Sequence, residues 1–158
     1  MDVFIVYVVV AIVLFMGSFA TKRRFGLLGL AIAAGSLLSS IWSYGVELMI
    51  SGVGFPSGPL TTAIVQSIII ILPAGVLLFH GYTYKTLFGR AIGAGLFAIL
   101  ATAFLVEPLG HVLMPHGLGT NIYNWLVNNR DMIIGVGLTL AVFDLFTTKP
   151  VQLADKKR

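Results

Sequence analysis

The sequence has no cysteine and very little charge. Of its 158 residues, 10% are charged and 58% are hydrophobic, and the mean hydropathy is +0.98. A water-soluble domain of this length needs about a quarter of its residues charged to cover its surface. The low charge therefore excludes a soluble domain and predicts an all-α integral membrane protein. The absence of cysteine excludes disulfides and thiolate chemistry.

Motifs of catalysis and nucleotide binding are also missing. The chain contains neither a GxxxxGK[ST] loop nor an HExxH pair, and its Ser, His and Asp residues show no triad-like spacing. An internal duplication of the kind found in inverted-repeat transporters is not visible either. These absences predict a protein that is not an enzyme and that carries no cofactor.

What the chain does contain is a series of long apolar stretches. About 20 apolar residues are enough to cross a hydrocarbon core of ~30 Å. Five stretches predict transmembrane helices, at about 3–20, 25–50, 59–80, 87–106 and 131–147. They form a single polytopic domain over residues 1–148, and a short basic cytoplasmic tail follows at 149–158. Asp2 before the first stretch and cations directly after it argue against a cleaved signal peptide.

The segment between the fourth and fifth stretches is different in character. Residues 107–129 are polar and are interrupted by Pro108, Pro115 and several glycines. We expect Thr120 to cap a short amphipathic helix and Asp131 to cap the last span. This predicts an interfacial or re-entrant segment between helices four and five. An alternative, in which the last helix continues back into this segment, stays open.

The cations are distributed unevenly about the five predicted spans. Only Arg130 falls on one side, and the other nine of the ten cations fall on the opposite side: Lys22, Arg23, Arg24, Lys85, Arg90, Lys149, Lys156, Lys157 and Arg158. Short loops rich in Lys and Arg remain cytoplasmic. We therefore predict an inner (plasma) membrane protein with its N-terminus outside and its C-terminus in the cytoplasm. The same pattern explains the net charge of +4 without a nucleic-acid partner.

Small residues recur at helical spacing in the second and fourth stretches. Such stripes let two backbones approach closely, and serine hydroxyls can bond across the contact. We predict that the two stripes pack together, although small residues are common in membrane helices generally. The predicted packing residues are Ala31, Gly35, Ser39, Ser43, Gly89, Gly93, Ala94, Ala98 and Thr102. The predicted partners are the lipid bilayer and a second copy or another membrane protein.

Two further groups are candidates for function. Gln66 and Ser67 precede Pro73 in the third stretch, and a proline kink beside polar residues can line a path for ions or solutes. An adaptation of helix packing is the alternative. Glu107 and His111 have the spacing of metal ligands, but Pro108 lies between them and a third strong ligand is not evident. We therefore predict no metal site.

Several features through about residue 105 occur together in one known family. They are Met1-Asp2 before the first helix, the basic loop Lys22-Arg23-Arg24-Phe25-Gly26, a small-residue second helix, an apolar third helix and the block Gly89–Gly95 at the fourth. In this order they resemble the colicin V production (CvpA) family of small bacterial membrane proteins. The asparagine-rich outer segment and the fifth span are not covered. The resemblance implies an inner-membrane protein in envelope maintenance or export, and it carries over no catalytic residues.

These observations predict a non-enzymatic protein that acts by helix packing with itself or a partner. The alternative is a channel or transporter subunit with a path near Gln66, Ser67 and Pro73. A small membrane enzyme that uses Glu107 and His111 on the outer face is the third hypothesis.

Overall fold

The computed structural model describes residues 3–52, 54, 58–80, 83–84, 86–110, 112 and 119–147. Over these residues it is all-helical, apart from one isolated bridge between Arg23 and Thr83. The helices are α1 (Val3–Thr21), α2 (Phe25–Gly52), α3 (Pro59–Phe79), α4 (Leu87–Gly110) and α5 (Gly119–Phe146). The predicted tail at 149–158 lies outside the described residues, as do Lys85, His111 and Pro115.

Four of the helices are long and apolar enough to cross a membrane. The qualifying segments are Phe25–Gly45 of α2, Pro59–Phe79 of α3, Leu87–Gly110 of α4 and Thr120–Phe146 of α5. α1 is apolar but shorter by the same measure, over Ile5–Thr21. The predicted all-α architecture is confirmed, and the four long apolar helices are compatible with a multi-pass membrane protein.

The start of α5 differs most from the sequence prediction. The predicted start near 131, with Asp131 as its cap, is wrong because α5 begins at Gly119 and continues through this residue. No proline or glycine occurs between Thr120 and Ile134, so nothing in the chain interrupts the helical hydrogen bonds there. Residues 119–129 are thus the first turns of α5 and not a separate interfacial helix. α4 also runs past the predicted end at 106, through Pro108 to Gly110.

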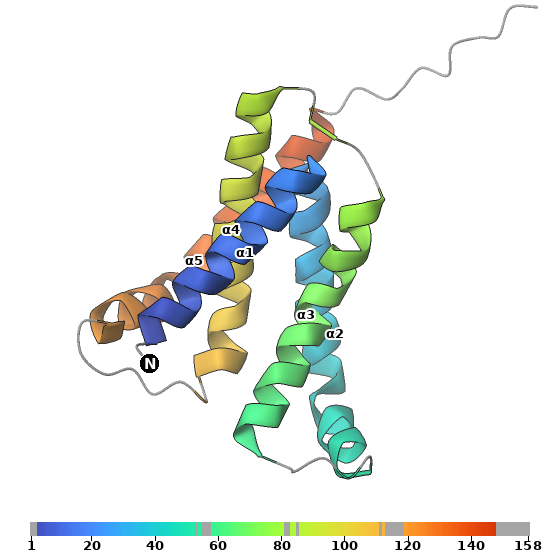
Figure 1. The fold of residues 1–158 in the computed structure, drawn as a ribbon, viewed down its shortest axis with the longest axis vertical. Helices are drawn as coiled ribbons and strands as arrows, with labels where there is room; N and C mark the ends of the chain where they lie inside the picture. Colours follow the sequence, from blue (N-terminus) through green and yellow to red (C-terminus); the bar gives the residue numbers. More distant parts are fainter. Residues whose placement is uncertain are drawn as a thin grey trace, which may run out of the picture.

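The helices form two groups that meet at one end. α2 packs most extensively on α3, and α1 packs on α4. Figure 1 shows α1, α4 and α5 on one side and the α2–α3 pair on the other, converging toward the top of the view. The buried core joins α2, α3, α4 and α5 and includes Phe25, Leu28, Ile32, Ile70, Ala74, Phe97, Leu100, Phe104 and Ala141. We call the end that carries Arg23, Arg24 and Arg90 the basic end.

Candidate functional site

A groove lies between α2, α3 and the last turns of α4, away from the basic end. Its volume is about 700 Å³, within the range of small-molecule sites. Its polar lining consists of Ser36, Ser39, Ser40, Ser43, Thr62, Gln66 and Glu107. Ala63, Ile70 and Phe104 are buried and form the apolar part of its floor. The groove therefore places a row of hydroxyl groups opposite a carboxamide.

More than half of this polar lining has unused hydrogen-bonding capacity. The side chains of Ser36, Ser39, Thr62 and Gln66 make no hydrogen bond to another described residue. Ser39 is only 7% exposed, so its free hydroxyl lies on the floor of the groove. The Ser39 hydroxyl is not one of the fully buried polar atoms that lack a partner, so it is reached from the groove and can bond to a polar occupant there.

The hydroxyls of the remaining two serines donate hydrogen bonds to carbonyl groups of their own helix, α2. Ser40 donates to the Leu37 carbonyl at 2.9 Å, and Ser43 donates to the Ser40 carbonyl at 3.1 Å. Neither Ser39 nor Ser43 bonds across a helix contact to another described residue. Both line the groove instead, Ser39 on its floor and Ser43 on its exposed rim.

The predicted polar path is only partly present. Gln66 lines the groove, but the Ser67 hydroxyl donates to the Ala63 carbonyl of its own helix at 2.7 Å. Pro73 lies inside α3 and is not among the residues that line the groove. Ile70 and Phe104 belong both to the groove floor and to the buried core. The described residues therefore form a groove that is closed toward the basic end.

The small residues of α2 contact helices other than the predicted one. A β-carbon on Gly35 would overlap the Ile70 backbone carbonyl of α3. A β-carbon on Gly26 would overlap the Ala141 carbonyl of α5. Ala31 is buried in the core. The backbone of α2 thus comes closest to α3 at Gly35 and to α5 at Gly26, while its Gly29 faces Leu100 of α4, which is not part of the predicted stripe.

The glycines of the α4 stripe accommodate an aromatic ring. β-carbons on Gly89 and Gly93 would both meet the ring of Tyr84, which precedes α4. Ala94 and Ala98 are buried, and the Thr102 hydroxyl donates to the Ala98 carbonyl at 2.7 Å. The space beside these two glycines is therefore occupied by Tyr84 and not by α2.

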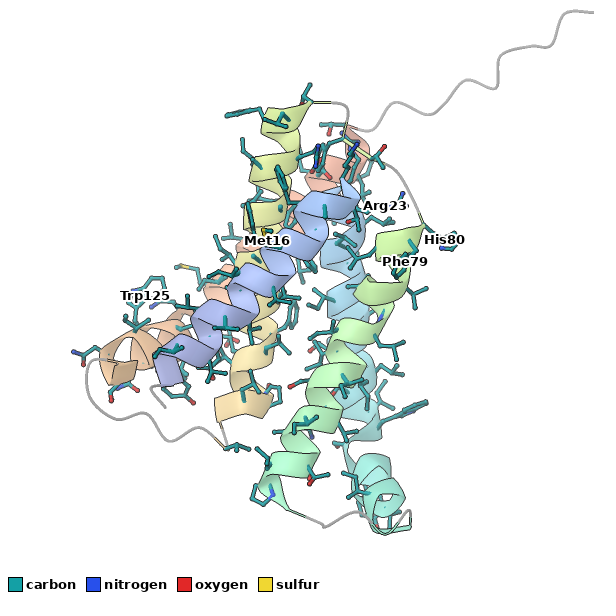
Figure 2. All side chains as sticks on the ribbon, viewed as in Figure 1. Met16, Arg23, Phe79, His80 and Trp125 are labelled. Carbon is teal, nitrogen blue, oxygen red and sulfur yellow. The ribbon has the colours of Figure 1, made fainter. Side chains whose placement is uncertain are left out.

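Three arginines at the basic end each bind the carbonyl end of another helix. Arg23 donates to the Leu78 and Phe79 carbonyls of α3 at 2.8 and 2.6 Å, and Figure 2 shows it beside Phe79. Arg90 donates to the Phe19 carbonyl of α1 at 2.7 Å. Arg24 donates to the Asp144 carbonyl of α5 at 3.5 Å. Cations there satisfy orphan carbonyls and offset the negative end of the helix dipole.

The backbone amides at the start of α2 find hydrogen-bond acceptors at the same basic end. The Phe25 amide donates to the Tyr84 hydroxyl at 3.1 Å, and the Gly26 amide donates to Oδ2 of Asp144 at 2.9 Å. Arg24 lies 3.9 Å from the other oxygen of that carboxylate. Arg23, Arg24, Tyr84, Arg90 and Asp144 together form what we call the cap cluster.

Tyr84 is the member of the cap cluster that the sequence analysis missed. Burial raises the pKa of its phenol, and the charge and hydrogen bond of Asp144 act in the same direction. The Phe25 amide and Arg24 oppose this rise in pKa. The phenol therefore stays neutral at physiological pH, so that it can bond to Asp144 while it accepts from Phe25. Its position in a loop gave no signal of these long-range partners.

An ion pair closes the opposite end of α4. Arg130 of α5 donates to Oε2 of Glu107, whose carboxylate borders the groove. His111, the other candidate metal ligand, lies outside the described residues. Among the residues that the structure describes, no group of three or more His, Asp or Glu side chains could hold a metal ion.

Comparison of the chain with known protein families, with curated proteins and with solved structures finds no match.

Proposed function

We propose that the chain is a non-enzymatic inner-membrane protein that binds a polar ligand in the groove, in envelope maintenance or export. The groove carries this proposal, because Ser36, Ser39, Thr62 and Gln66 converge there with free hydrogen-bonding groups. Such groups are costly inside a membrane unless they meet a polar partner. The resemblance to the colicin V production family supports the role in the envelope.

The proposal includes five spans with the basic end in the cytoplasm. α1 has 19 residues, and a rise of 1.5 Å per residue gives it a length of about 29 Å. This length suits a ~30 Å hydrocarbon core. The described cations Lys22, Arg23, Arg24 and Arg90 lie at the end where α1, α3 and α5 finish, which supports a cytoplasmic location for that end. The groove then opens in the outer half of the membrane.

Single cysteines test this orientation cleanly, since the chain has none of its own. Ser43→Cys on the groove rim should react with a membrane-impermeant maleimide in right-side-out spheroplasts. Phe88→Cys, at an exposed position of the basic end, should react only after permeabilisation. Ala101→Cys, at a position with 0% exposure, is the control that stays unlabelled in both conditions. Labelling of Phe88→Cys in intact spheroplasts would reverse the orientation and overturn the proposal.

Transport is the second candidate function. Gln66 faces the groove, as the path hypothesis requires. The closed floor at Ile70 and Phe104 means that a transport cycle requires α2, α3 and α4 to separate there. Binding without passage needs no such rearrangement, so we place it first.

Packing with a partner is part of the proposal. Only 6% of the apolar segment of α5 is buried within the chain, compared with 61% of the apolar segment of α4. A helix so little covered by its own chain is the surface most available to a second copy or to another membrane protein.

A further inference from the structure

Among the described residues, the polar lining of the groove is close to electrically neutral. Glu107 is the one charged side chain among the described residues that line it, and Arg130 pairs with that carboxylate. The N-terminus of α3, at Gly58 and Pro59, also borders the groove and would favour an anion by itself. The carboxylate of Glu107 in the same lining opposes anion binding. A cation on the buried floor would need carboxylate partners there, but the described residues of the floor provide hydroxyls instead.

The free groups both donate and accept hydrogen bonds. Each hydroxyl of Ser36, Ser39 and Thr62 offers one donor and two acceptor positions, and the Gln66 carboxamide offers two of each. The matching ligand is uncharged and alternates donors with acceptors over a short distance. Hydroxyl groups on adjacent carbon atoms have this property, which is the chemistry of a sugar or polyol.

The depth of the groove matches the head-group region of the outer leaflet. Trp42 and Tyr44 of α2 are 52% and 75% exposed, and aromatic side chains of this kind collect at membrane interfaces. Trp42 lies about 26 Å along α2 from Phe25, at 1.5 Å per residue. Gln66 lies about 10 Å along α3 from Pro59 by the same measure. The rim is thus level with the interface, and Gln66 on the floor lies about two turns of helix below it.

We propose that the groove binds a neutral polyhydroxyl group, carried either by a lipid head group or by a free sugar. This inference rests on the proposed function, and it names the ligand class of that same site. Ser39 and Gln66 bind the ligand from opposite helices on the floor, while Ser36 and Thr62 flank them. The volume of about 700 Å³ leaves room for more than one sugar ring.

Protection of a cysteine in the groove tests the inference. The full chain carrying Ser40→Cys, in the groove lining but outside the proposed ligand-binding set, is placed in phosphatidylcholine nanodiscs, and its rate of alkylation by N-ethylmaleimide is measured. One arm adds diglucosyl diacylglycerol to the nanodisc, and a second arm adds free maltose to the buffer. At about ten times the dissociation constant, one-site binding should slow alkylation about tenfold. Protection in the first arm alone identifies a lipid head group, and protection by maltose identifies a free sugar.

Matched variants show whether protection comes from the groove. Gln66→Leu and Ser39→Ala, each added to Ser40→Cys, should weaken protection, and either one suffices if the other fails to fold. Ser67→Ala should leave it unchanged, because that hydroxyl bonds to its own helix outside the groove. Ready alkylation without protection in either arm means a water-filled groove only and overturns the ligand class. Absence of alkylation in plain phosphatidylcholine nanodiscs overturns the proposed function itself.

Discussion

Gly35 is the position where α2 comes closest to α3. A β-carbon there would overlap the Ile70 carbonyl, and backbone atoms cannot move aside as a flexible side chain can. Gly45 lies ten residues further along the same helix, and a β-carbon there meets nothing within 4 Å. Two glycines of one helix therefore make opposite demands on space.

We expect Gly35→Ala to destabilise the protein by about 1–3 kcal/mol, the usual cost of overfilling a packed contact. Gly45→Ala should be neutral or slightly stabilising, because alanine favours a helix over glycine by about 1 kcal/mol. The free energy of unfolding in mixed micelles, followed by circular dichroism as sodium dodecyl sulfate is added, measures both. Equal effects of the two substitutions would contradict a close α2–α3 contact at Gly35.

The contrast between these glycines shows which part of the helix packing can be predicted from the sequence. Spacing identifies residues that permit close approach, and Gly35 was among them. It does not identify the partner, since the α4 stripe has the same pattern and its Gly93 accommodates Tyr84 instead. The partner depends on which helices the short α1–α2 turn and the other connections bring together, and that information is not local.

The cap cluster links the ends of four helices. α1, α3 and α5 present carbonyl groups to Arg90, Arg23 and Arg24, while α2 presents amides to Tyr84 and Asp144. Each helix end would otherwise leave backbone groups without partners near the membrane surface. The cations that orient the chain in the sequence prediction therefore also hold the helices together.

Tyr84→Phe should destabilise the bundle by about 1–2 kcal/mol, because it removes the hydroxyl that accepts from Phe25 and bonds to Asp144. Tyr44→Phe, at a position 75% exposed in α2, is the matched control and should leave stability unchanged. The midpoints of thermal unfolding in detergent give the comparison. If the two variants melt together, the Tyr84 hydroxyl does not contribute to the cap.

The beginning of α5 was harder to predict than its end. Asn121, Asn124 and Asn128 suggested a separate amphipathic segment, because asparagine is unfavourable inside an isolated helix. All three are exposed, so none places an unbonded amide in the core. Continuity of the helix depends on the absence of a breaking residue, which outweighs weak local preferences. Hydropathy alone located the apolar segments of all five helices but not this boundary.

The groove lies where the two groups of helices diverge. Sequence reasoning had singled out Ser39, Ser43 and Gln66 for two separate purposes, and the structure brings them to one cavity. The additional spacing of Ser36, Ser40 and Thr62 at intervals of three or four residues would have extended both polar faces. The divergence of α4 from α3, which creates the space of the groove, could not be predicted from the sequence.

Reconstituted protein should not conduct through this groove. Proteoliposomes loaded with potassium and maltose are expected to release both no faster than protein-free liposomes, because Ile70 and Phe104 close the floor. Release is followed by a potassium electrode and an enzymatic maltose assay. Flux that disappears in Gln66→Leu and persists in Ser67→Ala would favour the transport function over binding alone.

The cap cluster also has a consequence for the order of biosynthesis. The amide groups at the start of α2 emerge early, yet the Asp144 carboxylate that binds Gly26 belongs to the last helix. The carbonyl end of α1 likewise lacks its partner until Arg90 is made, 71 residues after Phe19. The earliest turn of the chain therefore obtains its final partners only after α4 and α5 have been made, and a nascent chain released before α5 leaves that turn without its cap.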